Sequence, residues 1–312
     1  MFSYKRLIIV VRFLVVALAW LGIQACSQST AQLTDQASLA QNEQLPLVYY
    51  KEFGDRQELL EQDDIFALTA KQLADFEAYR NKISNQDILR HQLVANYLQK
   101  AIEGFNYHSK TYVAAESAEH RTGNCLSLAI LTTALAQAAD IDVGYELMRT
   151  PPVYQKKGNV ILSSQHIRSI LHKPISNKHN GWIQYMAPVL KIDYFPTERG
   201  QVQRRVSHAE FVSMYYRNIA AEAIIEKRLN VAFWNLVESL KYAKNDAHAT
   251  NMLALVYDNA GYSKDAEKLY QFGIKHAINK LELYSNYHKF LLRDERFAEA
   301  SEIKMEIDKL DI

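Results

Sequence analysis

The stretch from Arg121 to Ala139 reads RTGNCLSLAILTTALAQAA, and it joins a polar turn to a long apolar segment. Apolar residues fill almost every position after Cys125, which predicts a helix from about Cys125 to about Ala139 that is buried on most sides. The Gly123-Asn124 turn delivers Cys125 to the first turn of this helix. Free backbone N–H groups and the helix dipole favour a thiolate there, so the sequence predicts a lowered thiol pKa.

A thiolate nucleophile needs a base and a group that orients the base, and residues of both types follow downstream. His166 and Asp193 lie in segments that we expect to be strands. Two neighbouring antiparallel strands would bring them together against the start of the cysteine helix. His172 is a rival base, because a residue six positions along an unbroken strand points the same way. His120 and His179, in expected loops, are weaker candidates.

Without such partners, the same three residues have ordinary structural interpretations. Cys125 would be an inert core thiol, which is a common place for cysteine. His166 would be a satisfied strand histidine, and Asp193 would cap the end of a strand.

Hydrophobic periodicity predicts an α+β fold from about Asp64 onward. Apolar residues at helical spacing predict one helix carrying Phe66, Leu68, Leu73 and Phe76, and a second from Leu89 to Ile102. After the cysteine helix, the pattern predicts an antiparallel meander of strands at Val143–Met148, Val160–Leu162 with Ile167–Leu171, and Val189–Phe195. We expect the turns between them at Pro151-Pro152, Lys156–Gly158 and Asn177–Gly181.

From about His208 the chain is expected to be helical to its end, with an internal repeat. Ala232, Ala266 and Ala300 are spaced by 34 residues (266 − 232 and 300 − 266). This is the length of a tetratricopeptide unit, in which a small residue is needed where two helices cross closely. A general helical bundle with a chance period is the alternative interpretation.

The segment from about 85 to 200 resembles the transglutaminase-like superfamily. The resemblance is carried by Gly123–Ser127, Thr150–Val153, His166-Ile167 and Ile192–Phe195. It implies a papain-like cysteine domain with an antiparallel sheet and a triad of Cys125, His166 and Asp193. It also implies amide hydrolysis or acyl transfer on a protein or peptide, without a metal or another cofactor.

This chain departs from the pattern of that superfamily in two respects. The 27 residues from His166 to Asp193 (193 − 166) exceed a tight hairpin, and the upstream oxyanion-binding residue has no counterpart that can be assigned. The segments that carry the resemblance also look like a bacterial group in which this domain precedes tetratricopeptide repeats.

The amino-terminal segment has the pattern of an export signal. Lys5 and Arg6 precede an apolar run whose uninterrupted part, Phe13–Ile23, is too short for a membrane span. It ends in Ile23-Gln24-Ala25-Cys26, which resembles the bacterial lipobox and implies lipidation of Cys26. By resemblance to lipoprotein sorting in bacteria with two membranes, Ser27 in the next position implies the outer membrane, facing the periplasm. An uncleaved anchor beginning near Leu7 is the alternative.

These patterns divide the chain into four parts. We expect a signal peptide over residues 1–25, a lipidated polar tether over 26–60, the transglutaminase-like domain over 61–207, and the helical repeats over 208–312.

Composition and absent motifs exclude several classes of function. The net charge of +1 supports no nucleic-acid partner. The sequence lacks the glycine-rich nucleotide loops, the zinc-protease HExxH and the serine-hydrolase GxSxG. We therefore expect an envelope-anchored, membrane-associated cysteine enzyme that acts on a protein or peptide, and the location also permits cell-wall peptide. The alternative is a non-catalytic scaffold that binds a partner protein through its repeats.

Overall fold

A computed structural model of the chain describes residues 44–83, 88–157, 160–172, 189–194, 201–277 and 280–310, with the side chains of 149–165 excepted. Cys26, the predicted signal peptide and most of the predicted tether lie outside these ranges. Within them, no helix has both the length and the apolar character needed to cross a membrane. Residues 48–312 form one compact unit, which is described below.

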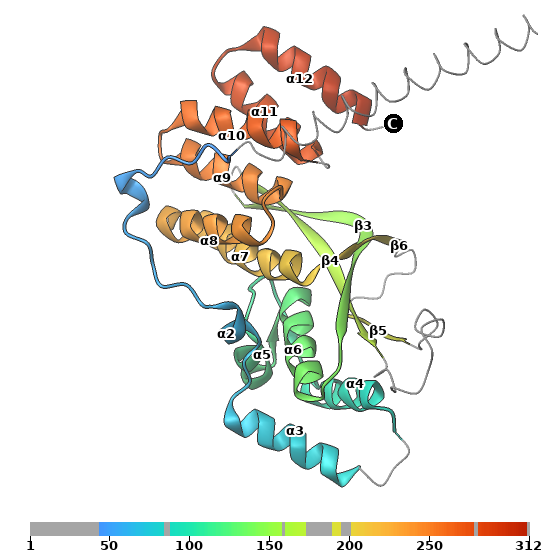
Figure 1. Cartoon of the computed structure of the whole chain (residues 1–312). Coiled ribbons are helices and arrows are strands. Elements are labelled where there is room, and N and C mark those ends of the chain that lie inside the picture. The colour runs from blue at the N-terminus through green and yellow to red at the C-terminus, as the bar shows by residue number, and fades with distance from the viewer. Residues whose placement is uncertain are drawn as a thin grey trace, which may run out of the picture. The chain divides into compact units, whose positions relative to one another are not determined.

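The sheet has four strands and antiparallel pairing throughout, as the alternating pattern predicted (Figure 1). Its strands are β3 (Val143–Lys157), β4 (Val160–His172), β5 (Val189–Asp193) and β6 (Gln201–Val206), in the spatial order β5-β4-β3-β6. Strand β6 was not predicted, because its sequence QVQRRV is polar and four of its first five residues carry charge or amide groups. It pairs with β3 at the sheet edge, where polar side chains are tolerated.

The turn predicted at Pro151-Pro152 is wrong, since β3 continues through both prolines. The pairing of β3 with β4 is regular up to Met148 and resumes at Val153, with an irregular register between them. Proline lacks a backbone N–H and cannot donate to the ladder, but its φ angle is compatible with an extended chain. The two prolines therefore interrupt the hydrogen bonding and leave the strand direction intact.

In the described part of the chain, five α-helices come before the four-stranded sheet. They are α2 (Gln62–Phe66), α3 (Ala70–Lys82), α4 (Arg90–Ala101), α5 (Ala114–His120) and α6 (Cys125–Ala138). The single helix predicted from Phe66 to Phe76 is two helices instead. Thr69 ends the run, because its hydroxyl accepts the Gln72 N–H and its own N–H donates to the Gln72 side chain. This capping box starts a new helix in mid-pattern.

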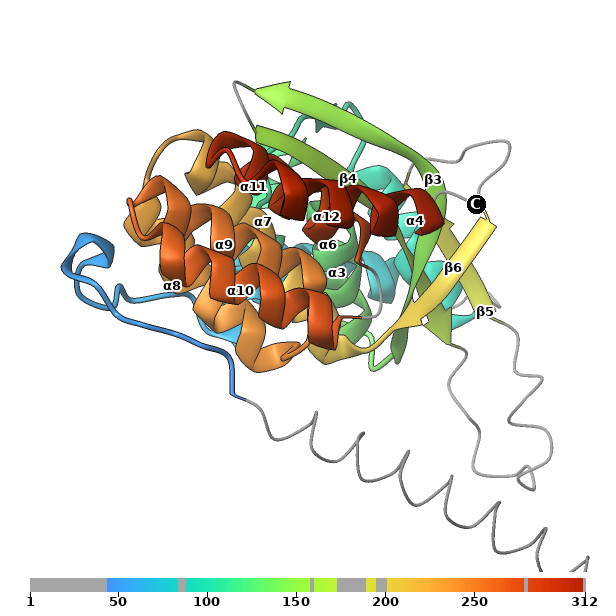
Figure 2. The ribbon, with the colours of Figure 1, turned by 90° about the horizontal axis from the view of Figure 1, so that it is seen from above.

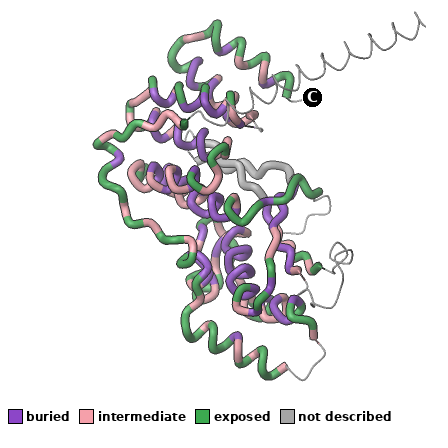
Figure 3. Tube along the Cα trace, viewed as in Figure 1, coloured by how far each residue is buried: buried purple, intermediate pink, exposed green. Residues whose placement is uncertain are grey.

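The cysteine helix α6 forms the centre of the core, as predicted. Every residue from Leu126 to Ala136 is buried (Figure 3). The helix packs against β4, and the Tyr194 hydroxyl just after β5 is hydrogen-bonded to the Thr132 hydroxyl of α6 at 2.7 Å and to the Ser169 hydroxyl of β4 at 2.8 Å. These buried hydroxyls satisfy one another and fix the helix against the sheet.

The carboxyl-terminal region consists of helix pairs that stack in chain order, which Figures 1 and 2 show from two directions. The helices are α7 (His208–Ile225), α8 (Leu229–Tyr242), α9 (Ala247–Asn259), α10 (Ser263–His276), α11 (Leu281–Arg293) and α12 (Phe297–Leu310). Ala232, Ala266 and Ala300 each occupy the fourth position of the second helix of a pair, and all three are buried. The period found in the sequence is therefore a period of the structure.

The turn inside each pair repeats with the same spacing of 34 residues (261 − 227 and 295 − 261). Lys227, Gly261 and Glu295 all adopt a left-handed backbone conformation, with φ of 58°, 89° and 58°. The residue after each of these donates its N–H to a carbonyl of the helix that has just ended. For example, the Tyr262 N–H donates to the Tyr257 carbonyl at 2.9 Å. A left-handed residue with such a bond is a common helix terminator.

Candidate active site

Cys125 is the first residue of α6, and Asn124 caps the helix immediately before it. The Asn124 side-chain oxygen accepts the Ser127 N–H at 2.9 Å, and the Ser127 hydroxyl accepts the Asn124 N–H at 3.3 Å. This reciprocal pair satisfies two of the backbone donors that a helix start leaves open. The sequence indicated the turn, and the cap explains why the helix begins at the cysteine.

Gly123 is required for the approach to Cys125. Its φ of +143° is one that side-chain-bearing residues rarely adopt, and a Cβ there would lie 2.6 Å from the Ser127 side chain. Gly123 also pairs with Tyr107, through the short parallel strands β1 (Asn106–Tyr107) and β2 (Thr122–Gly123). The loop that carries the thiol is therefore held on both sides.

A chain of hydrogen bonds joins this loop to α7, the first helix of the repeat region. The Asn124 amide donates to the Thr111 hydroxyl at 2.8 Å, and Asn218 of α7 donates to the same hydroxyl at 3.2 Å. The Thr111 N–H donates to the Glu222 carboxylate of α7 at 2.7 Å, while burial raises the pKa of Glu222. The helical repeats thus contribute directly to the position of the cysteine loop.

The structure brings His166 and Asp193 together. His166 Nε2 and Asp193 Oδ1 are 2.7 Å apart, and both side chains are largely shielded from solvent. The pairing of β4 with β5 places Asp193 opposite Arg168, two residues from His166 on the same strand. Diagonal neighbours of this kind lie on one face of a sheet within reach of long side chains. The loop expected to span the gap, from Lys173 to Gly181, lies outside the described residues.

The Cys125 thiol lies against β4 beside this pair. The backbone N–H of Ile167, the residue after His166, donates to the sulfur, as do the N–H groups at the start of α6. The Asp193 carboxylate is close enough for its charge to act on the thiol. The three predicted residues therefore converge where β5 ends next to β4 and α6 begins.

The prediction of a lowered thiol pKa is wrong. Burial raises the pKa of Cys125 above its ordinary value, and the negative charge of Asp193 adds to the rise. Hydrogen bonds from the N–H groups of Ile167, Leu126 and Cys125 itself act in the opposite direction but are outweighed. The N–H groups at the helix start favour the thiolate, as expected. The loss of solvation disfavours the thiolate by more than these N–H groups favour it.

The rival base His172 lies elsewhere on β4. It pairs with Val189, and its Nε2 would be 3.0 Å from a Cβ on Gly144, so its ring packs over that glycine. At about 3.3 Å per residue, six residues separate it from His166 by roughly 20 Å along the strand. Asp193 bonds to His166, so His166 is the better candidate. His120 ends α5, and His179 lies outside the described residues.

Next to the site lies a group of ion pairs that was not predicted from the sequence. Glu146, which is buried, accepts from Arg168 at 2.5 and 2.6 Å and from Lys191 at 3.4 Å. Arg168 stands directly opposite Asp193 across the β4–β5 ladder. Strand alternation predicts that His166 and Arg168 lie on the same face of the sheet. Their partners on β3 and β5 depend on the register of the strands, which the sequence does not specify.

Among the described residues, no three histidine, cysteine, aspartate or glutamate side chains gather as they would around a metal ion. Comparisons of the chain with protein-family models, with curated proteins and with solved structures gave no match in any of the three.

Proposed function

We propose that the protein is a cysteine enzyme of transglutaminase-like type that hydrolyses an amide or transfers its acyl group. The observation that carries the proposal is the 2.7 Å His166–Asp193 pair beside a thiol at a helix start. An imidazole oriented by a carboxylate is the arrangement that activates a nucleophile. The sequence resemblance supports the same assignment of roles.

In the proposed reaction, the Cys125 sulfur attacks the carbonyl carbon of the amide while His166 takes the thiol proton. Asp193 holds the ring through Nε2, so Nδ1 is the nitrogen that accepts this proton. The tetrahedral intermediate expels the amine, which takes the proton from His166. Water or a second amine then attacks the thioester and releases the acyl group, restoring the thiol.

The raised thiol pKa bears on the resting state. Because burial raises the pKa of the Cys125 thiol, the proposed reaction moves the thiol proton to His166 as the sulfur attacks the carbonyl carbon. The N–H groups at the start of α6 lie beside the sulfur and would stabilise the oxyanion.

Labelling with a thiol-directed electrophile tests the roles of the three residues. We expect iodoacetamide to modify Cys125, and His166→Ala to slow this labelling by about 10²-fold, the usual contribution of a general base. His172→Ala is the matched control, because this histidine lies on the same strand away from the thiol. Equal effects of the two substitutions would exclude His166 as the base.

The proposal extends to location and substrate. Cys26 is the proposed lipidation site, which would anchor the protein at the outer membrane in the periplasm. The helix pairs are the proposed tetratricopeptide repeats and would present a protein or peptide substrate. Metabolic labelling with a fatty acid analogue, compared between the native chain and Cys26→Ala, tests the anchor.

A binding scaffold is the second candidate function, and the raised pKa of Cys125 favours it. A thiol whose pKa is raised by loss of solvation is also typical of an inert core cysteine. Complementation of a strain lacking the protein separates the two functions, using Cys125→Ala and a chain that ends at Ala243. If only the shortened chain fails to complement, the enzyme proposal is wrong.

A further inference from the structure

The segment Val48–Arg56, here called the strap, crosses the helix pairs far from its place in the sequence. It appears in blue beside α8, α9 and α10 in Figure 1. Apart from the single 3₁₀ turn η1 (Lys51–Phe53), it is without regular secondary structure. The sequence predicted a polar tether over 26–60, and this prediction is wrong for the strap, because its aromatic residues pack on the helices.

Side chains of the helices bind the main chain of the strap. The Val48 N–H donates to the Tyr257 hydroxyl at 2.9 Å, and that hydroxyl donates to the Val48 carbonyl at 2.5 Å. The Trp234 indole donates to the Phe53 carbonyl at 3.1 Å. Hydrogen bonds from polar side chains to the main chain of another segment are typical of a bound peptide.

Two aromatic side chains three positions apart anchor the strap. Phe53 is 1% exposed and stacks on Phe233 with ring centroids 4.1 Å apart. Tyr50 stacks on Tyr262 at 3.5 Å. Buried aromatic residues with a polar tip are the usual anchors of a protein interface.

Specific polar contacts accompany the stacking. The Tyr50 hydroxyl donates to Asp265 at 2.5 Å, and the Tyr262 hydroxyl donates to Glu52. Asp265 is itself buried in the first turn of α10. The surface therefore selects for a hydroxyl at one aromatic position and for an apolar ring at the other.

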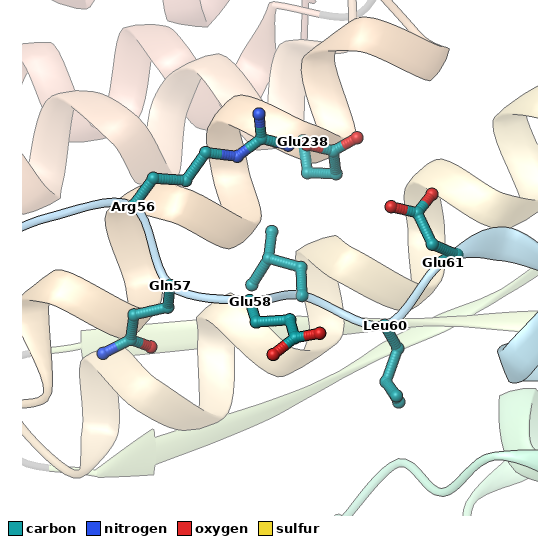
Figure 4. Close-up of a pocket in the computed structure, with 7 residues that line it drawn as sticks. Arg56, Gln57, Glu58, Leu60, Glu61 and Glu238 are labelled. Carbon is teal, nitrogen blue, oxygen red and sulfur yellow. Dashed lines mark hydrogen bonds and ion pairs between the residues drawn. The ribbon is translucent and has the colours of Figure 1, made fainter.

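Beyond Phe53 the chain is attached less closely. Arg56 reaches Glu238 at 3.2 Å across a pocket that is lined by residues 56–61 and, from the helices, by Glu238 alone (Figure 4). None of its lining residues belongs to the Cys125 site. The contacts of the strap are thus concentrated in Val48–Phe53. The stretch that connects it to α2 is held separately, since the Leu60 carbonyl accepts from the Tyr216 hydroxyl of α7 at 2.7 Å.

We propose that Phe233, Trp234, Tyr257, Tyr262 and Asp265 form a binding site for a peptide segment with one 3₁₀ turn, which the chain fills with its own strap. The strap acts as a ligand held in cis, and a partner protein's segment with Tyr and Phe three positions apart competes for the same site. The site lies on the helix pairs and is independent of the proposed catalysis.

Fluorescence anisotropy with a labelled synthetic peptide of residues 48–57 tests the proposal. The full chain carrying Tyr50→Ala and Phe53→Ala has a weakened strap, so its site is open to the peptide. We expect this variant to bind the peptide at least about tenfold more tightly than the native chain, whose strap competes at high effective concentration. Tyr50→Phe, which loses only the hydroxyl bond to Asp265, should give a smaller change in the same direction.

Peptide variants supply controls that do not affect the fold of the protein. A peptide with the same two alanines should not bind, while Lys51→Ala should bind like the native peptide, because the Lys51 side chain is 92% exposed. Equal binding of the peptide by the native chain and by both variants, or no binding to any of them, would overturn the proposal. Dimerisation of the native chain through exchanged straps would also overturn it, since the strap would then act between copies.

Discussion

At the scale of single residues, the environment of one sulfur decides between a nucleophile and a core thiol. Cys125 receives N–H groups from the start of α6 and from Ile167, which favour its thiolate. Burial and the nearby Asp193 charge favour the protonated form and prevail. The proposed reaction therefore requires His166 to remove the thiol proton during the attack.

The pH dependence of thiol labelling follows from the direction of the pKa shift. The fraction of reactive thiolate rises with pH and reaches half only above the ordinary thiol pKa of about 8.5. We expect the rate of iodoacetamide labelling of Cys125 to be still rising at about pH 10, where a free cysteine peptide has levelled off. Mass spectrometry of samples quenched at each pH measures the rates, and a plateau below pH 8 would contradict the assigned direction.

Gly123 is the residue most sensitive to a single added carbon in the loop before the thiol. Gly123→Ala combines a positive φ of +143° with a 2.6 Å contact to Ser127, whereas Gly104→Ala combines a positive φ of +72° with open space around the added methyl. We expect Gly104→Ala to cost about 1 kcal/mol of unfolding free energy. Gly123→Ala should cost about 1–3 kcal/mol more, by urea denaturation, because the added methyl overpacks the site. Equal losses of unfolding free energy in the two variants would mean that the loop shifts to accommodate the added methyl without cost.

At the scale of elements, the repeat depends on small residues where paired helices cross and on the turns between them. The buried alanines and the left-handed turn residues recur with one period, so each pair repeats one local solution. Side chains around the alanines supply the apolar contacts, while the turn residues set the angle at which the second helix leaves.

Two alanines in α12 separate helix propensity from packing. Ala300 is 1% exposed and Ala298 is exposed, and they are two residues apart in the same helix. Ala300→Leu should destabilise the protein by about 1–3 kcal/mol through overpacking. Ala298→Leu makes the same chemical change on the surface, and it should change the free energy of unfolding by no more than about 0.5 kcal/mol. Urea unfolding of both variants gives the comparison, and similar values would indicate that the crossing is loosely packed.

A buried ion pair connects the first two helix pairs. Arg217 of α7 donates to Asp246 at 2.6 Å, both side chains are about 10% exposed, and Asp246 also caps α9. Burial alone would raise the pKa of Asp246, but the Arg217 charge and the capping N–H groups lower it below its ordinary value. The pair therefore adds stability above the unfolded-state pKa of about 3.9, and this stability is lost as pH falls through the lower folded-state value.

Asp246→Asn tests this ion pair while keeping a residue that caps helices well. It leaves the Arg217 charge buried without its partner, which should cost about 3–5 kcal/mol at pH 7. The difference from the native chain should be constant at neutral pH and should shrink below about pH 4, as Asp246 itself becomes protonated. A difference that grows on acidification would reverse the assigned sign. Chemical denaturation at several pH values provides the measurement.

At the scale of the whole molecule, α7 belongs to the core of the cysteine region as well as to the repeats. Phe211 of α7 stacks on Tyr145 of β3 at 3.9 Å, and residues Phe211–Tyr216 join α6 and the sheet in one apolar cluster. The sequence boundary between 207 and 208 matches the change from strand to helix. In the core, however, no gap in packing separates the two regions.

Shortened chains test this shared core. A chain ending at Ser207 loses the aromatic face of α7, so we expect it to bind a hydrophobic dye and to unfold without a cooperative transition. A chain ending at Ala243 keeps α7 and α8 and should unfold cooperatively in urea, at a lower midpoint than the full chain. Cooperative unfolding of the shorter chain would show that the sheet and α6 suffice as a core.

Much of the fold and the site was accessible from local patterns. The buried helix at Cys125, the antiparallel pairing and the 34-residue period each follow from side-chain spacing within a few turns or one repeat. The single helix across Thr69 and the turn at Pro151-Pro152 were wrong for a local reason. Capping and strand continuity compete with periodicity there, and neighbours in space decide the outcome.

The sequence by itself determined which residues have the chemistry of a cysteine site and in what order they occur along the chain. Tertiary structure alone decided that Asp193 bonds to His166, that burial raises the pKa of the Cys125 thiol, and that the strap lies on the helix pairs. The physical reason is that hydrogen-bond pairing, desolvation and aromatic stacking depend on distances between residues remote in sequence. Those distances exist only after the strands have paired and the helices have packed.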